Sequence, residues 1–530
     1  MSVGEFADAI DIAPANVVVL KNGRATAVRL SALDPRPSTR SVASSSADAT
    51  TSSTTRIEKT NLSSTDRFDD MSPELDVSAF AIQFQKFLDT MSDLAEQPDR
   101  DVFESELGRH LGASPRSLAP VRQEFPHWRW VDVDAALDAL SATQTLRGVV
   151  PADDPDGLSE VLSNRYGNYA WGSVERTALP SGPGRVTHVA TNAIRQLEID
   201  GLPVIAFATE STSQDPEGAI AVEVLSADAA VSRRVLSRID THVREQSALG
   251  GQVVSFVAGQ YGSEQGEIRF HPRPQVPRRD VVLPAGSLDR IEESVLGVSE
   301  NAAALREAGQ HLSRGVLLFG PPGTGKTHTV RYLLSRAADT TAIVLNGDSL
   351  SHIRQAADAA RDLGRAIIVL EDADLVAADR DFSEGERSVL FDVLDILDGL
   401  ADDADIAFVL TTNRVGVLEE ALALRPGRID LAVEIPLPDL ELRRQLFTRY
   451  GHHLPFTERG IDLAAVAAEG TTGSFAKEAV RRAVMSALAL HEDLTDTHLV
   501  AAVDALVREA GELRDAMAHD AEDHDLSDDD

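Results

Sequence analysis

The sequence predicts an α/β fold in which a parallel β-sheet lies between two layers of helices. A glycine-rich loop at residues 320–327 separates a short apolar run from a segment with apolar residues at helical spacing. Two further runs, residues 366–370 and 406–410, are apolar throughout, which is typical of strands buried on both faces. Segments long enough for helices lie between these runs, and strands that alternate with helices favour a parallel sheet.

The glycine-rich loop carries the most specific chemical signal in the chain. It fits G-x-x-x-x-G-K-[ST] and reads Gly320-Pro321-Pro322-Gly323-Thr324-Gly325-Lys326-Thr327. The pattern requires a strand before it and a helix after it, and residues 315–319 and 328–338 suit both. In such a loop the backbone N–H groups and the helix N-terminus attract phosphate, the lysine reaches the β and γ oxygens, and the hydroxyl ligates Mg²⁺. We therefore predict a P-loop that binds a nucleoside triphosphate, with Lys326 on the phosphates, Thr327 on Mg²⁺ and His328 as the next nucleotide-binding residue.

Polar residues follow the next two apolar strands of this region. Residues 366–370 are followed by Glu371-Asp372-Ala373-Asp374, and residues 406–410 by Thr411-Thr412-Asn413. Carboxylates at the carboxyl end of a buried parallel strand, after a phosphate loop, belong to the Mg²⁺ and water side of phosphoryl transfer. One carboxylate is expected to hold Mg²⁺, directly or through water, and the next to accept the proton of the attacking water. Asn413 would place a neutral amide beside the γ-phosphate.

Two arginines come next in the order of motifs. Arg425 and Arg428 lie three residues apart in the segment Arg425-Pro426-Gly427-Arg428-Ile429-Asp430. Alone they would be ordinary surface charges. After the preceding motifs they are predicted to be arginine fingers that reach the nucleotide of a neighbouring subunit.

Length and composition limit the classes of function. A chain of 530 residues should hold about two or three domains. The absence of cysteine excludes disulfides, thiolate metal sites and cysteine nucleophiles. The net charge of −35 disfavours nonspecific nucleic-acid binding as the main activity. The first residues lack a basic n-region, and no run approaches the roughly 18 apolar residues of a membrane span, so we expect a cytoplasmic protein.

The chain divides into seven predicted parts. They are an N-terminal hairpin segment (1–34), a disordered Ser/Thr-rich linker (35–75), a helical segment (76–160), a small α/β domain for client or partner binding (161–275), the ATPase large domain (276–438), a helical lid (439–510) and an acidic disordered tail (511–530).

The parts before the ATPase domain show no catalytic constellation. An apolar stripe from Phe80 to Met91 predicts a helix that packs on a core. The aromatic cluster at residues 125–130 is expected to anchor a loop, with a binding role as the alternative. Strands are predicted at residues 202–207, 219–224 and 252–256 and a helix at 229–246, and the proline-rich residues 271–277 are expected to be a stiff linker.

Residues from about 281 to 510 resemble an AAA+ ATPase, close to the AAA family proper. The loop at 320–327 matches its Walker A sequence and Thr411-Thr412-Asn413 its sensor 1. Residues 397–400 resemble its intersubunit signalling segment, Arg425 and Arg428 its paired fingers, and residues 470–474 the turn in its helical lid. The resemblance implies a P-loop NTPase with a C-terminal lid that hydrolyses ATP with Mg²⁺ and forms a ring, commonly a hexamer.

Two features depart from the family pattern. The Walker B strand of the family ends in Asp-Glu, whereas this chain has Glu371-Asp372, an inversion also found in the mitochondrial AAA ATPases that translocate a folded Rieske protein. The resemblance then implies that Glu371 is the carboxylate on the Mg²⁺ side and Asp372 the base, and a non-hydrolysing site is the alternative. Residues 346–364 contain no Phe, Tyr or Trp, so the aromatic loop that grips threaded chains is missing, and Phe382 could enter the pore instead.

Three functions compete on this evidence. The first is an ATP-driven remodeller of protein complexes that recruits an unknown protein client through residues 1–275. The second is a nucleotide-gated scaffold or switch, in which the state of the ring is the output. The third is a DNA-directed machine, which the acidity disfavours. A proteasome-activating role is also not expected, because the chain ends in Asp528-Asp529-Asp530 instead of a hydrophobic–Tyr–any sequence.

Overall fold

The computed structural model describes residues 17–21, 24–28, 86, 102–150, 155, 157–164, 169–210, 219–257, 267–372, 404–413 and 429–525. The chain forms two units, Met1–Asp76 and Val77–Asp530. In the first, β1 (Val17–Lys21) and β2 (Arg24–Val28) pair antiparallel, which confirms the hairpin expected there. The predicted linker 35–75 and the stripe from Phe80 to Met91 lie outside the described residues, apart from Lys86.

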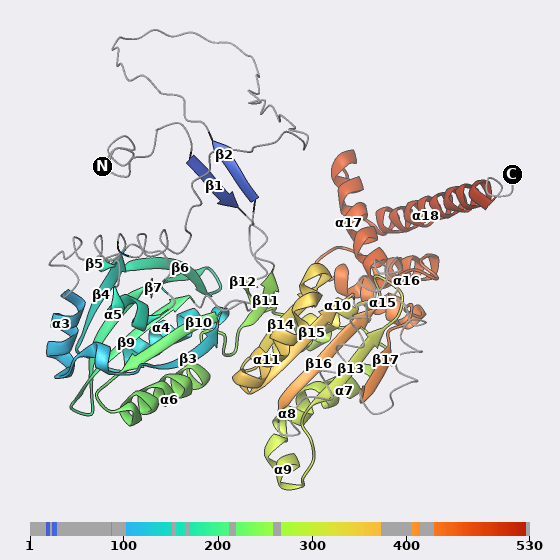
Figure 1. Ribbon diagram of the computed structural model, residues 1–530. Helices are drawn as coiled ribbons and strands as arrows, with labels where there is room; N and C mark the ends of the chain where they lie inside the picture. The colour runs from blue at the N-terminus through green and yellow to red at the C-terminus, as the bar shows by residue number, and fades with distance from the viewer. Residues whose placement is uncertain are drawn as a thin grey trace. The chain divides into compact units, whose positions relative to one another are not determined.

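An antiparallel six-stranded sheet organises residues 102–225 of the second unit (Figure 1). Its strands, in spatial order, are β3 (Val121–Pro126), β10 (Ala219–Leu225), β9 (Leu202–Glu210), β8 (Ala193–Ile199), β4 (Gln144–Val150) and β5 (Ala170–Gly172). A separate hairpin joins β6 (Glu175–Gly182) to β7 (Arg185–Thr191).

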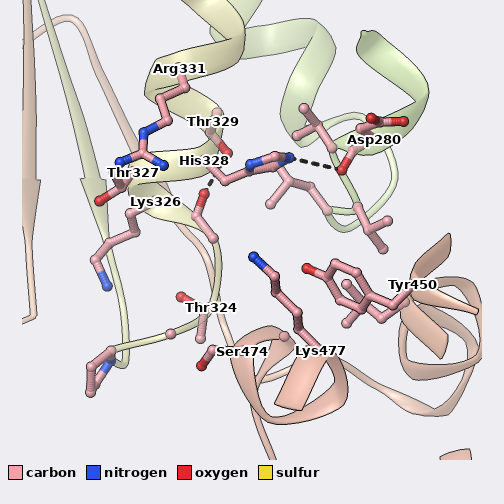
Figure 2. A pocket seen from close by; sticks show the side chains of 18 of the residues that line it. Asp280, Thr324, Lys326, Thr327, His328, Thr329, Arg331, Tyr450, Ser474 and Lys477 are labelled. Atoms are coloured by element: carbon pink, nitrogen blue, oxygen red, sulfur yellow. Dashed lines mark hydrogen bonds between the residues drawn. The ribbon is translucent and has the colours of Figure 1, made fainter. Parts of the chain in front are cut away.

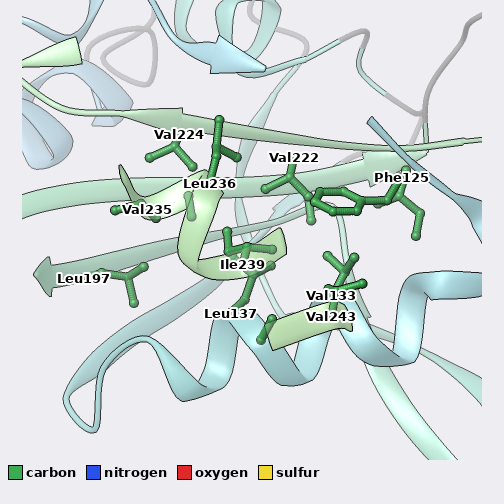
Figure 3. Packing of buried hydrophobic residues seen from close by; sticks show 14 of the residues in the cluster. Phe125, Val133, Leu137, Leu197, Val222, Val224, Val235, Leu236, Ile239 and Val243 are labelled. Atoms are coloured by element: carbon green, nitrogen blue, oxygen red, sulfur yellow. The ribbon is translucent and has the colours of Figure 1, made fainter. Parts of the chain in front are cut away.

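Helices cover both faces of this sheet. On β9, Val204, Ala206 and Ala208 join one core cluster, whereas Ile205 and Phe207 join another, because successive side chains of a strand point to opposite faces. The first cluster includes α4 (Trp130–Ala139) and α6 (Ala229–Glu245), and Figure 3 shows Val235 and Ile239 of α6 packed towards Leu197 and Val222 of the sheet. The second includes α3 (Val102–Leu111) and α5 (Leu158–Ser163).

The boundary predicted between a helical segment (76–160) and an α/β domain (161–275) is therefore wrong. β3 and β4 lie in the first part and pair with β10 and β8 of the second. The helix at 229–246 and the strands at 202–207 and 219–224 are confirmed. β3 was missed because it is an edge strand whose exposed side chains, such as Arg122 and Glu124, interrupt its apolar pattern.

A seven-stranded sheet forms the centre of the ATPase region. Its order is β12 (Glu267–His271), β11 (Val253–Val257), β14 (Thr341–Asn346), β15 (Arg365–Glu371), β16 (Asp405–Thr412), β13 (Arg314–Phe319) and β17 (Leu431–Glu434). Every neighbouring pair is parallel except β11 with β12. One core cluster contains α11 (Ile353–Leu363), and the other contains α10 (Lys326–Arg336) and α7 (Ser287–Glu292). The predicted three-layer α/β fold is confirmed.

The sheet begins earlier in the chain than predicted. β11 was expected in the small α/β domain, but it pairs with β14, which carries the ATPase sheet across the predicted boundary at residue 276. The linker after β12 is tied to the same domain, because the Arg273 guanidinium donates to the carbonyl oxygens of Gly251, Leu334, Ala337 and Thr340 over 2.6–2.9 Å. These four hydrogen bonds fix the linker to the ATPase domain, whereas its prolines only restrict its backbone conformation.

A helical subdomain follows β17, as the lid prediction expected. It consists of α15 (Leu440–Tyr450), α16 (Glu458–Ala467), α17 (Gly473–Leu490) and α18 (Asp496–Asp525), which share a core of mostly small side chains such as Ala464, Ala479 and Ala483. The predicted disordered tail (511–530) is wrong up to Asp525, because α18 continues to that residue. None of the described helices combines the length and the apolar character needed to cross a bilayer.

Candidate nucleotide-binding site

The glycine-rich loop joins β13 to α10 and uses glycine where no other residue fits. Gly320, Gly323 and Gly325 have φ values of +142°, +77° and +114°, a region that L side chains rarely adopt. A Cβ atom on Gly320 would lie 2.2 Å from the carbonyl oxygen of Ile435, which follows β17. The loop therefore owes its path both to backbone conformation and to the strand beside it.

Lys326 is the charged group at the centre of the loop. It is 5% exposed, and its Nζ donates to the carbonyl oxygens of Gly320 and Pro321, each at 2.8 Å. A buried ammonium is stabilised further by an anion, so this arrangement suits a phosphate. The position agrees with the role predicted from the motif.

A cavity of about 410 Å³ opens beside the loop (Figure 2). Ligand pockets of this size are typical for small molecules. Its walls come from four places: residues 322–329 and Arg331 of the loop and α10, Asp372 and Asn413 from the ends of β15 and β16, residues 280–283 before α7, and five residues of the lid, Leu446, Tyr450, Gly473, Ser474 and Lys477. The walls thus bring together segments almost 200 residues apart in the sequence.

The ends of β15 and β16 are joined by side chains. Asn413 Nδ2 donates to Asp372 Oδ1 over 3.3 Å, and the Asp372 backbone N–H donates to Thr411 Oγ1 over 3.0 Å. Asp372 has φ +51°, a left-handed conformation that aspartate tolerates better than most residues. The structure places both predicted polar groups, Asp372 and Asn413, on the wall of the cavity.

Glu371 occupies a different environment from Asp372. Burial raises the pKa of the Glu371 carboxyl, while the nearby Arg331 guanidinium and a hydrogen bond from the Thr327 hydroxyl counteract that shift. The contact with Thr327 brings together the two residues predicted on the Mg²⁺ side. Glu371 itself lies beside the cavity and does not line it.

The lid and the segment before α7 supply residues that the motif analysis missed. The Ser474 N–H donates to the carbonyl oxygen of Gly323 over 3.1 Å, and His328 Nε2 donates to that of Asp280 over 3.1 Å. Tyr450 and Lys477 complete the lid side. The sequence indicated residues 470–474 only as a turn of the lid, and no pattern indicated Asp280, Tyr450 or Lys477, which meet the loop only after the lid has packed against it.

The segment after β14 was predicted to lack the aromatic loop that grips threaded chains. Residues 347–352 form a short 3-10 helix that leads directly into α11, with Leu350 buried and the His352 ring 6.5 Å from the ring of Phe256. This agrees with the prediction. The other predicted features, namely Ala373, Asp374, Phe382, residues 397–400, Arg425 and Arg428, lie outside the described residues.

Comparison with known proteins agrees with this geometry. Residues 316–437 match the family model "ATPase family associated with various cellular activities (AAA)". The chain is 30% identical over 243 residues to a proteasome-activating nucleotidase of Archaeoglobus fulgidus. The aligned region covers 43% of this chain and 59% of that protein. It is 32% identical over 260 residues to ATP-dependent zinc metalloprotease FtsH 2 of Sphaerobacter thermophilus, covering 47% of this chain and 39% of that protein. The human ATPase family gene 2 protein homolog B is 30% identical over 249 residues, 44% of this chain and 32% of that protein.

These matches cover only part of the chain. The matched part spans less than two thirds of the length of each of these three relatives, and the match to the family model ends at residue 437. Within that part lie the glycine-rich loop and the polar residues Asp372 and Asn413 that line the cavity. The chain therefore contains an AAA ATPase domain with the P-loop NTPase fold.

Proposed function

We propose that this protein hydrolyses ATP as a ring-shaped oligomer and uses the turnover to remodel protein complexes recruited by the region before residue 276. One observation carries the proposal: Lys326, Asp372 and Asn413 line the same cavity at the carboxyl edge of a parallel sheet. Catalysis of phosphoryl transfer depends mainly on positioning and charge, and these are the groups that supply both.

Different residues would contact the phosphates, the base and sugar, and Mg²⁺. Lys326 and the N–H groups of residues 323–327 bind the phosphates, and residues 280–283 with Tyr450 form the wall for the base and sugar. Thr327 and Glu371 present hydroxyl and carboxylate oxygens, the ligands that Mg²⁺ prefers, and they already contact one another. Mg²⁺, when bound, would neutralise charge on the phosphate oxygens.

Asp372 is proposed as the group that takes the proton of the attacking water. Its Oδ1 accepts a hydrogen bond from Asn413, which orients the carboxylate at the wall of the cavity. Asn413 would also place its amide beside the γ-phosphate. Glu371, one residue earlier and on the strand itself, remains on the Mg²⁺ side.

Assembly into a ring, commonly a hexamer, is part of the proposal. Its support is the order of motifs, in which Arg425 and Arg428 follow the Asn413 strand and would act on a neighbour's nucleotide. The relatives named proteasome-activating nucleotidase and zinc metalloprotease share the ATPase region with this chain. We infer the ring from that shared ATPase region alone.

A second candidate function is a nucleotide-gated scaffold, in which ATP binding and ring state are the output. The short turn at residues 347–352 favours it, because Leu350 and the contact of His352 with Phe256 leave little freedom to grip a moving chain. The two candidates differ in whether protein clients accelerate turnover.

Steady-state hydrolysis over a range of protein concentrations tests the proposal. We expect phosphate release by the wild type, none by Lys326→Ala, and a rise in specific activity as rings form. Turnover that increases when client proteins are added supports the remodeller. ATP-dependent assembly with constant slow turnover supports the scaffold, and absence of ATP binding in the wild type would rule out both.

A further inference from the structure

The six-stranded sheet before the ATPase region ends in an edge strand, β3. β10 pairs with one side of β3, and no other strand in the part of the chain that the structure describes pairs with its second side. In an antiparallel edge strand, the N–H and C=O groups of every second residue point away from the sheet. β3 has six residues, so about three of them present main-chain groups outwards. A further extended chain can complete this hydrogen-bonding pattern.

A groove of about 450 Å³ lies between β3 and α6, which Figure 1 shows beside each other. Residues 121–123 of β3 form one wall, and the other contains Arg233, Ser237, Asp240 and Arg244 of α6. These four residues are three or four positions apart, so they form a single stripe along the helix. The side-chain amide of Gln123 donates to Asp240 Oδ1 over 3.4 Å and joins the two walls.

The groove carries positive charge in an acidic chain. Its lining includes Arg122, Arg233 and Arg244 against one acid, Asp240, whereas the whole chain has a net charge of −35. Arg122 is engaged by two glutamates of the sheet, at 2.8 and 3.2 Å. Arg244 pairs with Asp240 at 3.0 Å, whereas Arg233 is exposed and has no carboxylate partner among the residues described. A ligand in the groove would therefore meet the charges of α6 first.

The spacing of the two α6 arginines suits an extended chain. Arg233 and Arg244 are 11 positions apart, which corresponds to about 16 Å along the helix axis. An extended chain covers this distance in about four to five residue steps. Acidic side chains at positions i and i+4 of such a chain project from the same face, within reach of both arginines.

We propose that β3 and α6 bind an extended acidic segment of a client protein, which adds to the sheet as a further strand. Main-chain hydrogen bonds to β3 would supply the affinity, and carboxylates facing Arg233 and Arg244 would supply the selectivity. A second copy of this chain would bring two sets of these arginines together, so the charges favour a different, acidic partner. The inference rests on the proposed function and names the chemistry that the region before residue 276 recognises.

Fluorescence anisotropy with a labelled peptide of about ten residues, in which valine alternates with glutamate, tests the groove. The full chain should bind this peptide, and binding should weaken by roughly tenfold or more when lysine replaces glutamate in the peptide. Arg233→Glu should weaken binding of the glutamate peptide to a similar extent. Arg234→Glu is the matched control, because Arg234 is also exposed but does not line the groove, and it should bind as the wild type does.

Amide hydrogen exchange distinguishes an added strand from simple attraction of charges. The outward N–H groups of β3 would gain acceptors, so exchange in β3 should slow when the peptide binds. Unchanged exchange in β3, equal binding of the two peptides, or equal losses in Arg233→Glu and Arg234→Glu would overturn the proposal. Protection of β3 that rises with protein concentration in the absence of peptide would assign the edge to a second copy, contrary to the proposal.

ATP hydrolysis by the same samples keeps this inference separate from the ATPase. Arg233 does not line the nucleotide cavity, so Arg233→Glu should hydrolyse ATP as the wild type does when no peptide is present. Hydrolysis by a wild type that binds neither peptide overturns the groove and leaves the ATPase standing. Binding of the glutamate peptide, with protection of β3, by a wild type that does not hydrolyse ATP supports the groove and overturns the proposed function.

A nucleic acid is the remaining ligand that arginines could attract. A single-stranded DNA of about ten nucleotides should neither bind the groove nor displace the glutamate peptide, because it cannot hydrogen-bond to β3 as a strand. Displacement of the peptide by this DNA, lost in Arg233→Glu and kept in Arg234→Glu, would assign α6 to phosphate binding and overturn the proposal.

Discussion

Asn413 and Asp372 hold each other in place across neighbouring strands, with 3.3 Å between Asn413 Nδ2 and Asp372 Oδ1. The amide follows β16 and the carboxylate follows β15, and the Thr411 hydroxyl also accepts from the Asp372 backbone. This hydrogen bond distinguishes the two neighbouring acids, Glu371 and Asp372. Asp372 is oriented at the cavity wall, whereas Glu371 contacts Thr327.

Asp372→Asn should leave ATP bound and stop turnover. A proton acceptor in general base catalysis contributes roughly 10²–10⁴-fold, so kcat should fall by about that factor while ATP affinity changes little. Glu371→Gln should chiefly raise the Mg²⁺ concentration needed for half-maximal activity. Steady-state kinetics with Mg²⁺ titration measures both effects, and wild-type turnover by Asp372→Asn would assign the base to Glu371 or Asp374.

Mixed assemblies should recover activity that neither parent variant has. In the proposed ring, Arg428→Ala subunits keep an intact nucleotide site, and Lys326→Ala subunits keep the proposed arginine finger. An arginine supplied in trans is worth roughly 10³-fold or more, so mixing the two should restore part of the turnover. If mixed rings form and no ratio restores activity, action in cis or strict coupling around the ring is indicated.

Arg129→Ala should destabilise the domain of residues 102–245. The guanidinium is 1% exposed and donates to the Val243 carbonyl oxygen at 2.9 Å, to Asp132 at 3.1 Å and to Asp362 of α11 at 3.3 Å. Removing one partner of a buried ion pair costs about 3–5 kcal/mol, because Asp132 would remain buried and charged.

Denaturant titration followed by tryptophan fluorescence measures this loss. All three tryptophans, at positions 128, 130 and 171, lie within residues 102–245, and Trp128 also packs against the ATPase core beside Phe256, so the signal reports on this domain and on its contact with the ATPase sheet. Asp362→Asn is the matched control: its side chain is 38% exposed, and its loss should cost less than about 1 kcal/mol. Equal losses for the two variants would show that the buried pair with Asp132 contributes nothing.

Asp405→Asn should lower stability at neutral pH, and the difference from the wild type should shrink in acid. Asp405, at the start of β16, accepts from Arg314 at 2.6 Å, Ser299 at 2.7 Å and Arg365 at 3.1 Å. Burial alone would raise the pKa of Asp405, but these donors outweigh it and the pKa is lowered. Breaking a buried pair of this kind costs about 3–5 kcal/mol.

The direction of the shift gives the pH window. Because the folded pKa lies below the ordinary value of 3.8, the stabilisation is complete above that value and is lost as pH falls through the lowered folded pKa. Urea midpoints should therefore differ by a constant amount above about pH 5 and converge below pH 3.8. A constant difference at all pH values would contradict the ion pair.

Several features of this protein could be predicted from the sequence because they depend on neighbours in the chain. The loop at 320–327 needs only its own glycines, Lys326 and the strand and helix that flank it. The strands that end at Glu371 and Thr412 are apolar throughout, and the polar residues after them must meet at one edge of a parallel sheet. These local rules predicted the parallel sheet, the glycine-rich loop and the position of Asp372 and Asn413 at the sheet edge.

Only the tertiary structure decided the features that depend on contacts between distant segments. β3 is too polar to be recognised as a strand before it pairs with β10, about 100 residues later. β11 has the composition of any buried strand, and only its pairing with β14 assigns it to the ATPase sheet. Lys477 appears in the sequence as an exposed helical lysine, and it becomes part of the nucleotide site because the packing of α17 against Gly323 places it there.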